Sequence, residues 1–474
     1  MRKYLLLLAP LFATSALYAC ESESGSSSSG SIAPFDGGGI DAPITPTPDG
    51  ATPDTSTPDV VTGPLPVTVL VNGLDGKPKA NVDVVFHDAT GAVIAQAKTG
   101  NTGQASSPAG LAVSMASALL GGANGSHVIT WTGVKSADIL ATTDIALQDS
   151  GFTGSYAVTY PAAAGTPTAY EAYVGTCSQF QQGGAAGTMN LPVYPSCVRP
   201  GNANNILVRA LNGNADVGYA FVKGVALANG PTSVPATVNA FATPGTFTVT
   251  SSNRPANQSE SLDLAVIAGT QLTFNRFQRF FDIETNSALF NGVPTNYAEG
   301  FQVFSTHTTG GSSEHRIIQR FAANATNVAI DYGQPLPNLL TRNLDNTDYK
   351  RPKLTWTSSA PLTGTDGGAV TLRWSANDES SHGWTVIVPP SAVEAKLPAL
   401  PATANAWLPP NPDAGLGLYQ PEILFVESDL IPNADDFRQQ AGIVLPFTTS
   451  GIIGNVVMPK VGKVRSVQFY VNEG

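Results

Sequence analysis

Apolar and polar residues alternate along much of the chain from residue 66 onwards, the pattern of strands with one buried face. Two apolar triplets each share one face of an expected strand: Val67, Val69 and Val71, followed by Val82, Val84 and Phe86. We therefore predict two consecutive β-strands at 67–71 and 82–86, each with one apolar face.

Turn-forming residues interrupt this first β segment about every ten residues, a spacing typical of antiparallel sandwiches. The interruptions are Asn72-Gly73, Asp75-Gly76, Thr90-Gly91, Gly100-Asn101 and Gly103. Similar short apolar runs occur later in the chain, at 205–211, 218–227, 245–251 and 262–269. No repeat of fixed period accompanies them, which argues against a propeller or a solenoid.

One short helix is expected near residues 434–441. Asn433 is a favourable N-cap, Asp435 and Asp436 lie in the first turn, and Gly442 is expected to end the helix.

The segment 66–160 resembles the carboxypeptidase-regulatory-like and bacterial Ig-like domains of surface proteins. The matching motifs are turn sequences: Gly76-Lys77-Pro78, Asp88 to Gly91, Thr99 to Gly103, and Ala105. The resemblance implies a β-sandwich and no catalytic site. Residues 161–474 resemble uncharacterised bacterial envelope lipoproteins.

Composition supports an all-β chain without a nucleic-acid partner. The 474 residues include 47 Gly and 36 Pro, which break long helices. Charged residues make up 12%, and the net charge is -11 at pH 7, so no basic surface is available to neutralise phosphates. The predicted fold is an antiparallel Ig-like β-sandwich at 66–160 followed by larger β-sandwich regions at 161–300 and 301–474.

The N-terminus has the pattern of an exported lipoprotein. Residues 1–19 combine Arg2 and Lys3 with a short apolar run, as in a secretory signal peptide. Residues 17–20, Leu-Tyr-Ala-Cys, resemble the lipobox of bacterial lipoproteins, which implies lipidation at Cys20. Ordinary cleavage after Ala19 is the alternative. The residue after this cysteine is Glu21 and not Asp, and in this the chain resembles lipoproteins that are released to the outer membrane.

Residues 20–65 are rich in Ser, Thr, Pro and Asp and contain few residues able to form a core. Such a segment is expected to remain disordered and to act as a tether between the lipid and the folded part.

Cysteine counting predicts one disulfide. If Cys20 carries lipid, Cys177 and Cys197 remain as a pair in an oxidising compartment. Two free thiols or a metal pair are the alternatives.

The strongest candidate for chemistry is the segment 302–321, in which His307 and His315 flank a short loop and Glu314 adjoins the second histidine. Two imidazoles and a carboxylate could ligate a metal ion. The alternative is a pair of polar histidines at a solvated hairpin. The sequence contains none of the local nucleophile, zinc-protease or phosphate-loop motifs.

Two further polar sets have simpler explanations than a binding or catalytic site. Asp345 and Asp348 could bind Ca²⁺, but the EF-hand spacing is absent and turn formation is the favoured explanation of these residues. Glu171, Glu422 and Glu427 could serve as glycosidase carboxylates only if the fold brought two of them together.

Strand parity predicts that Trp356, Trp374 and Trp384 point into a core. Trp407 lies in a Pro-rich segment without alternation. It is the expected exposed ligand contact, together with Tyr419.

The sequence as a whole indicates an exported envelope lipoprotein with a display, adhesion or ligand-binding role. No cofactor and no nucleic-acid partner is expected, and the anticipated partners are a membrane, reached through the lipid, and an envelope polysaccharide or protein. The alternative is a secreted hydrolase or metal-dependent enzyme in the C-terminal β region.

Overall fold

A computed structural model describes most of the chain beyond residue 62. The described ranges are 63–73, 77–122, 125–144, 154–175, 177–194, 203–227, 230, 232–254, 260–268, 271–275, 277–281, 287–309, 313–375, 381–409, 421–429, 431–444 and 462–469. The predicted signal peptide and all but the end of the predicted tether lie outside them. The described residues form four β-sandwich units, and the predicted all-β fold is confirmed.

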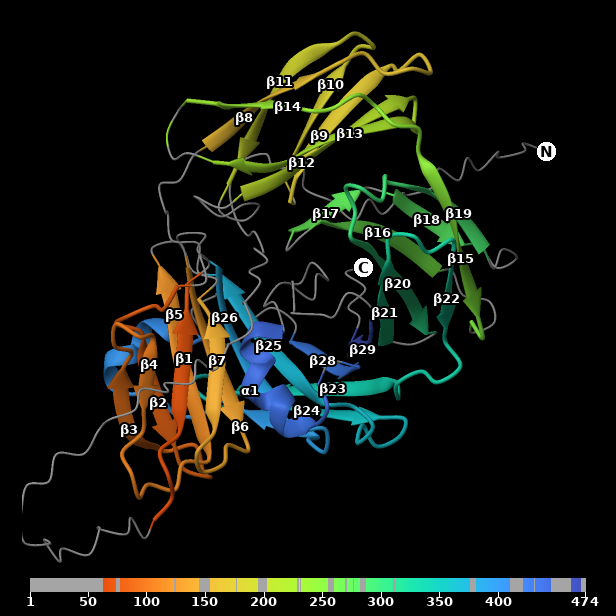
Figure 1. Cartoon of the computed structure of the whole chain (residues 1–474). Coiled ribbons are helices and arrows are strands. Elements are labelled where there is room, and N and C mark those ends of the chain that lie inside the picture. Colours follow the sequence, from red (N-terminus) through yellow and green to blue (C-terminus); the bar gives the residue numbers. More distant parts are fainter. Residues whose placement is uncertain are drawn as a thin grey trace, which may run out of the picture.

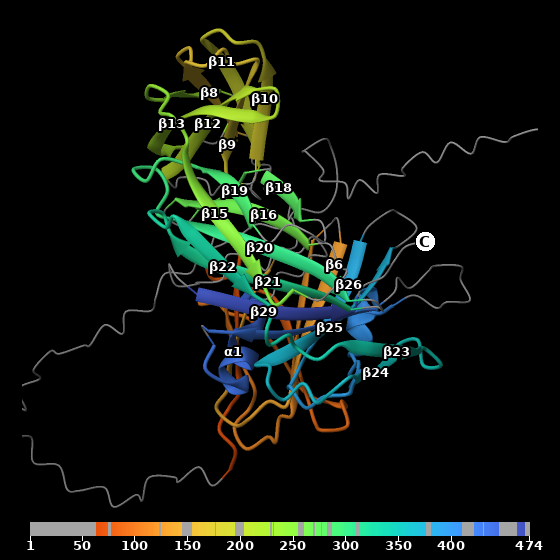
Figure 2. The ribbon, with the colours of Figure 1, turned by 90° about the vertical axis from the view of Figure 1, so that its right-hand side faces the viewer.

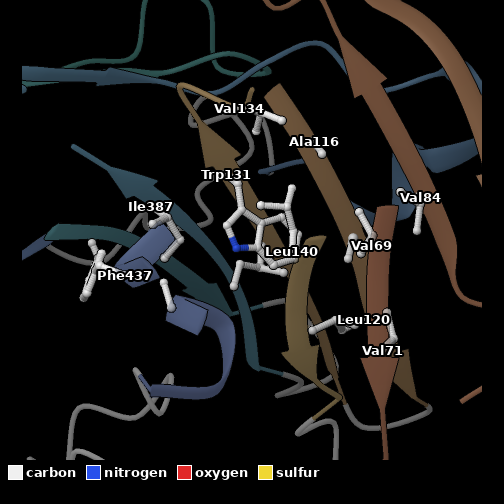
Figure 3. Close-up of a cluster of buried hydrophobic side chains, with 14 of the residues drawn as sticks. Val69, Val71, Val84, Ala116, Leu120, Trp131, Val134, Leu140, Ile387 and Phe437 are labelled. Carbon is white, nitrogen blue, oxygen red and sulfur yellow. The ribbon is translucent and has the colours of Figure 1, made fainter. Parts of the chain in front are cut away.

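The first sandwich spans residues 63–144. Its first sheet contains β1 (Thr68–Asn72), β4 (Gln104–Ser106) and β7 (Ile139–Thr143), with β1 and β7 parallel. It faces β2 (Asp83–His87), β3 (Val93–Lys98), β5 (Met115–Gly122) and β6 (Gly125–Thr132). Both predicted triplets are buried in the core between these layers. Figure 3 shows Val69, Val71 and Val84 in this core with Trp131.

The second sandwich spans residues 154–242. One layer is β8 (Gly154–Tyr160), β11 (Gly187–Val193) and β14 (Val234–Thr237). The other is β9 (Ala169–Val174), β10 (Cys177–Gln182), β12 (Ala203–Asn212) and β13 (Ala215–Ala226). The boundary expected after residue 160 lies between β8 and β9, which belong to one unit, so this unit begins at β8.

The third sandwich spans residues 245–332. Its smaller layer is β15 (Gly245–Ser252), β19 (Ser287–Gly292) and β22 (Asn327–Asp331). Facing it are β16 (Glu260–Ala268), β17 (Gln271–Asn275), β18 (Phe277–Phe281), β20 (Gly300–Thr309) and β21 (Ser313–Ala322). The boundary expected after residue 300 lies inside this unit, because β20 pairs with β16.

The fourth sandwich spans residues 336–469. One layer is β23 (Leu339–Asp345), β24 (Lys353–Ser358) and β27 (Glu394–Lys396), with the short 3-10 helix η1 (Ala402–Trp407) following it in the chain. The other is β25 (Gly367–Ser375), β26 (Ser381–Val388), β28 (Glu422–Ser428) and β29 (Gly462–Phe469). Trp356, Trp374 and Trp384 lie in its core, as strand parity predicted.

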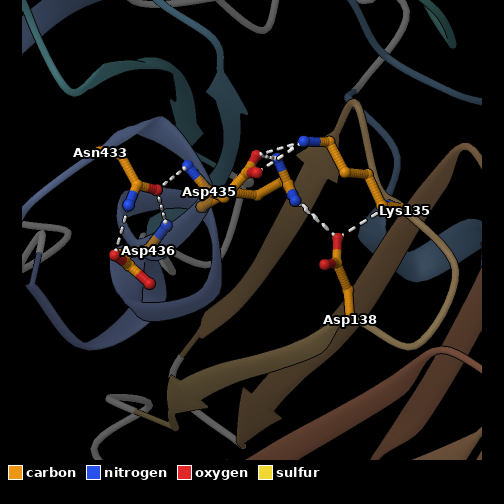
Figure 4. Close-up of polar contacts among 6 residues, drawn as sticks. Lys135, Asp138, Asn433, Asp435 and Asp436 are labelled. Atoms are coloured by element: carbon orange, nitrogen blue, oxygen red, sulfur yellow. Dashed lines mark hydrogen bonds and ion pairs between the residues drawn. The ribbon is translucent and has the colours of Figure 1, made fainter.

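Helix α1 (Ala434–Val444) packs against the first sandwich beside β7. The Asn433 side chain accepts hydrogen bonds from the backbone N–H groups of Asp435 and Asp436 at 2.9 and 3.0 Å, so the predicted N-cap is confirmed (Figure 4). The helix continues past Gly442 to Val444, beyond the predicted end.

The first, third and fourth sandwiches share one continuous sheet. Among the described residues this sheet has 13 strands, in the order β17-β16-β20-β21-β29-β28-β25-β26-β6-β5-β2-β3, with β18 alongside β16. Strand β29 pairs with β21 of the third unit and with β28 of the fourth. Strand β26 pairs in parallel with β6 of the first unit. Backbone hydrogen bonds therefore join these three units.

The second sandwich lies at one end of the molecule in both views, beyond the third (Figures 1 and 2). The described chain begins at the opposite end, where β1 is drawn in orange-red. The second and third units meet through the rings of Phe221 and Tyr297, 5.1 Å apart, and a hydrogen bond from Asn205 Nδ2 to the Ala268 carbonyl at 3.1 Å.

Candidate functional site

The two histidines singled out in the sequence are brought together. His307 on β20 and His315 on β21 are direct partners in the antiparallel ladder. Their ring centroids lie 5.0 Å apart, and the ring planes differ by 16°. The Tyr332 ring stands nearly perpendicular to the His307 ring, at 4.6 Å. Both histidines are buried. They therefore form an enclosed polar cluster, and the alternative of two histidines at a solvated hairpin is wrong.

Glu314 does not join this pair. It is the direct neighbour of His315 on one strand, and successive residues of a strand point to opposite faces. Its Oε1 accepts hydrogen bonds from Arg316 Nε at 2.5 Å and from Gln468 Nε2 at 2.8 Å. No group of three or more His, Cys, Asp or Glu side chains suited to a metal ion occurs within the described ranges.

Burial keeps both imidazoles neutral at physiological pH. Desolvation, with a smaller contribution from the His315 ring, lowers the pKa of His307 to about 4. Desolvation also lowers the pKa of His315, against an opposing effect of its hydrogen bond with Asn338. A neutral imidazole retains a nitrogen lone pair, so the pair can accept a proton or ligate a metal ion.

The acidic loop proposed for Ca²⁺ is organised as a turn. Asp345 Oδ1 accepts hydrogen bonds from the backbone N–H and the hydroxyl of Thr347, at 3.0 and 2.7 Å. The carbonyl of Asp348 accepts from the Arg351 N–H at 2.9 Å. These are the hydrogen bonds of a turn, the alternative to calcium binding at this loop.

The three available glutamates each face an arginine. Glu171 lies 3.7 Å from Arg209, Glu422 lies 3.5 Å from Arg373, and Glu427 lies 2.5 Å from Arg465. They lie on β9 and at the two ends of β28. Each glutamate is thus paired with a different arginine, which is a structural role and does not form a pair of catalytic carboxylates.

Trp407, expected as an exposed ligand contact, is half-buried. It packs against the core of the fourth sandwich, and its Nε1 donates a hydrogen bond to the Leu120 carbonyl of β5 at 3.3 Å. The indole therefore joins the first and fourth units. Tyr419, the second expected contact, lies outside the described residues.

The cysteine predictions concern residues that are only partly described. Cys177 is buried at the start of β10, where it packs in the core of the second sandwich. Cys197 and the lipidation site Cys20 lie outside the described ranges. The disulfide and the lipid anchor therefore stay predictions.

One buried ionic cluster was missed in the sequence. Arg209 on β12 donates from Nε to Asp216 Oδ1 at 2.6 Å and from Nη1 to the Tyr173 hydroxyl at 3.3 Å, and Glu171 lies on its other side. The available signal was the single arginine inside the apolar run 205–211, because a buried guanidinium requires acidic partners.

Comparisons with known proteins identify no family. No protein-family model matches the chain, and no curated protein matches it. Similar solved structures include the Bacillus anthracis TIE protein, at 11% identity and a TM-score of 0.16, with 57% of this chain and 50% of that protein covered. The chain thus spans half the length of that protein.

Two other solved structures have comparable scores. A putative cell adhesion protein from Bacteroides eggerthii is 10% identical, with a TM-score of 0.14 over 38% of this chain and 86% of that one. The major pilin subunit BcpA of Bacillus cereus is 11% identical, with a TM-score of 0.13 over 56% and 98%. TM-scores this low carry no argument about function.

Within the described residues, no helix has the length and apolar character needed to cross a membrane.

Proposed function

We propose that the chain is a lipid-anchored cell-envelope protein whose β-sandwiches serve display, adhesion or ligand binding. Lipidation at Cys20 would attach the chain to a membrane, the outer one by the lipoprotein resemblance, and the tether would separate that membrane from residue 63.

The observation that carries this proposal is the placement of the second sandwich. It occupies the end of the molecule opposite to the start of the described chain (Figures 1 and 2). A membrane attached through the N-terminal segment would therefore lie nearer the first sandwich. The second sandwich would be the unit held farthest from the anchor and the most accessible to partners.

The second sandwich also carries exposed aromatic side chains. Phe180 lies on the edge strand β10 and is 49% exposed, and Tyr194, just after β11, is 40% exposed. Exposed aromatic rings can stack on sugar faces or anchor a protein partner. They replace Trp407 as the first candidates for ligand contact.

The test is a pull-down of solubilised cell envelope and extracellular polysaccharide with the purified full chain. Retention of intact polymer or protein is expected, together with a loss of at least severalfold in the Phe180→Ala, Tyr194→Ala double variant. Leu340→Ala is the matched control, because Leu340 is 51% exposed but lies on the fourth sandwich. Equal retention by all three chains would contradict the placement of the contact, and released polymer fragments would favour a hydrolase.

Anchoring is tested separately by labelling growing cells with a fatty-acid analogue. The parent chain is expected to take up label and to sediment with membranes, and Cys20→Ala is expected to do neither. Equal labelling of both chains would overturn the lipid anchor without bearing on the ligand contact.

A further inference from the structure

His307 is a buried polar side chain whose bonding is incomplete. The residue is 2% exposed, and neither ring nitrogen forms a hydrogen bond with a described residue. Leaving buried polar atoms unpaired costs about 1–3 kcal/mol per group, so such atoms indicate a missing water or ion. The imidazole is therefore available to a ligand.

His315, its ladder partner, is oriented in the manner of a metal-binding histidine. Its Nε2 lies 2.7 Å from Asn338 Oδ1, an acceptor, so Nε2 carries the proton and Nδ1 holds the lone pair. Histidines that ligate metals commonly donate their second N–H to a carbonyl or carboxylate oxygen in this way. The backbone of Asn338 is itself held by Ser359: the Asn338 N–H donates to Ser359 Oγ at 2.9 Å, and the Asn338 carbonyl accepts from the Ser359 N–H at 2.8 Å.

The spacing of the two rings suits one shared ion. An ion about 2.0–2.1 Å from one nitrogen of each ring stands about 3 Å from each ring centre, and a tetrahedral angle then separates the centres by about 5 Å. The observed separation is 5.0 Å. The rings are nearly parallel, so one must rotate to aim its nitrogen at the ion. His307 can do so, because no hydrogen bond with a described residue fixes it and χ2 of histidine is soft.

We propose that His307 and His315 together bind a divalent transition-metal ion of the zinc type, with water completing the coordination. Neutral imidazole nitrogens suit Zn²⁺, Cu²⁺ and Ni²⁺ better than Ca²⁺ or Mg²⁺. Glu314 has no part in the site. Glu260 of β16 is the backbone partner of His307 on the side of β20 opposite to His315.

The location gives the ion a structural role. His315 pairs on its other side with Val467 of β29, and Asn338 immediately precedes β23. The site therefore lies where the third and fourth sandwiches join. An ion bound there only in the folded state would raise the melting temperature of the chain.

The test is calorimetric titration of Zn²⁺ into the chelator-treated full chain, with the melting temperature measured with and without the ion. One ion per chain and an increase in melting temperature are expected. His307→Gln and His315→Gln should each weaken binding at least tenfold, and Asn338→Ala by about tenfold through loss of the orienting acceptor. His382→Gln is the matched control and should bind as the parent does, since its Nδ1 bonds to Ser126 elsewhere, at 2.7 Å.

Circular dichroism establishes that each variant is folded. Should His315→Gln not fold, His307→Gln and Asn338→Ala still decide the question, because His307 loses no hydrogen bond to a described residue and Asn338 keeps its backbone bonds. The absence of stoichiometric Zn²⁺ binding by the parent chain would overturn the site and leave buried water as the partner of His307. Equal affinity of His307→Gln and His382→Gln would overturn it as well.

Discussion

Trp384 of β26 donates its indole N–H to the hydroxyl of Thr130 on β6, at 2.8 Å, across the parallel strand pair that joins the fourth sandwich to the first. Thr130 also contacts Ser117 Oγ at 2.7 Å, and Ser117 contacts His87 Nε2 at 2.9 Å. A chain of buried hydrogen bonds thus crosses the shared sheet. These directional hydrogen bonds add to the apolar packing and make the alignment of β6 with β26 specific.

Thr130→Val is expected to destabilise the protein by about 1–3 kcal/mol, because the shape is kept while the buried indole N–H loses its acceptor. Chemical denaturation measures the change. Thr341→Val is the control: its hydroxyl contacts Thr357 at 2.6 Å on an exposed surface, and the effect there should stay within about 0.5 kcal/mol. Similar losses in both variants would contradict a special role for the buried chain.

Arg438→Met is expected to cost about 3–5 kcal/mol. Arg438 of α1 lies 2.8 Å from Asp138, both side chains are buried, and the variant would leave that carboxylate without its guanidinium. Lys135→Met is the comparison, since Lys135 pairs with Asp435 on the exposed surface and should contribute less than about 1 kcal/mol. Chemical denaturation measures both free energies of unfolding. Equal losses in the two variants would mean that burial does not make the Arg438–Asp138 pair stronger than the Lys135–Asp435 pair.

Stability is expected to fall as the pH drops below 6.5. Burial lowers the pKa of His87, His127 and His307 to about 4, 3 and 4, so the unfolded chain binds protons that the folded chain rejects. Each histidine then costs about 2 kcal/mol at pH 5 relative to neutral pH. Asp263 acts in the opposite direction by about 1 kcal/mol, because burial raises its pKa to about 6.

Denaturation of the metal-free chain at pH 7.5 and pH 5 measures this effect. His87→Gln should remove roughly a third of the histidine contribution, and Asp263→Asn should steepen the loss. Unchanged stability at the two pH values would contradict the burial of uncharged imidazoles.

Ser466→Pro should weaken the junction between the third and fourth sandwiches. Ser466 lies in the middle of β29 and pairs with Arg316 on one side and Val426 on the other. Proline removes a backbone donor and is poorly tolerated in a central strand. Faster proteolysis between residues 332 and 339 and a lower denaturation midpoint are expected.

Leu340→Pro is the control for this junction. Leu340 lies on the edge strand β23, at an irregularity in the register between Leu339 and Thr341. Edge and bulge positions accept proline more readily. If Leu340→Pro lowered the denaturation midpoint as much as Ser466→Pro, the central position of β29 would not explain the loss of stability.

The predicted disulfide is tested by thiol titration of the chain purified without reductant. No reactive thiol from Cys177 or Cys197 is expected under denaturing conditions before reduction, and two are expected after it. Reduction should cost about 3 kcal/mol in the loop-entropy account of a closed loop of about 20 residues. Two thiols before reduction would disprove the pairing.

Local alternation predicted the features that depend on neighbouring residues. It placed Trp374 and Trp384 in a core, because side-chain direction alternates along each strand whatever the partner strand is. The same parity separates Glu314 from His315, so the sequence already held the reason to exclude that glutamate.

Distant pairings could not be deduced in this way. Trp407 is half-buried because of the Leu120 carbonyl, 287 positions away in the chain. The boundaries expected after residues 160 and 300 differ from the observed units because β8 pairs with β14 and β20 with β16, and local sequence does not encode those partners. The relation of Arg209 to Glu171 depends likewise on how β12 aligns with β9.

The pairing of β29 has a consequence for the order of assembly. A chain made from its N-terminus completes every strand of the third sandwich by residue 331, yet β21 receives its outer neighbour, β29 of the fourth sandwich, only when residues 462–469 emerge. Until then β21 exposes an unpaired edge, a template for wrong association. Chaperones that shield strand edges would therefore act on this chain over a window of about 130 residues of synthesis, and shortening that window should reduce aggregation.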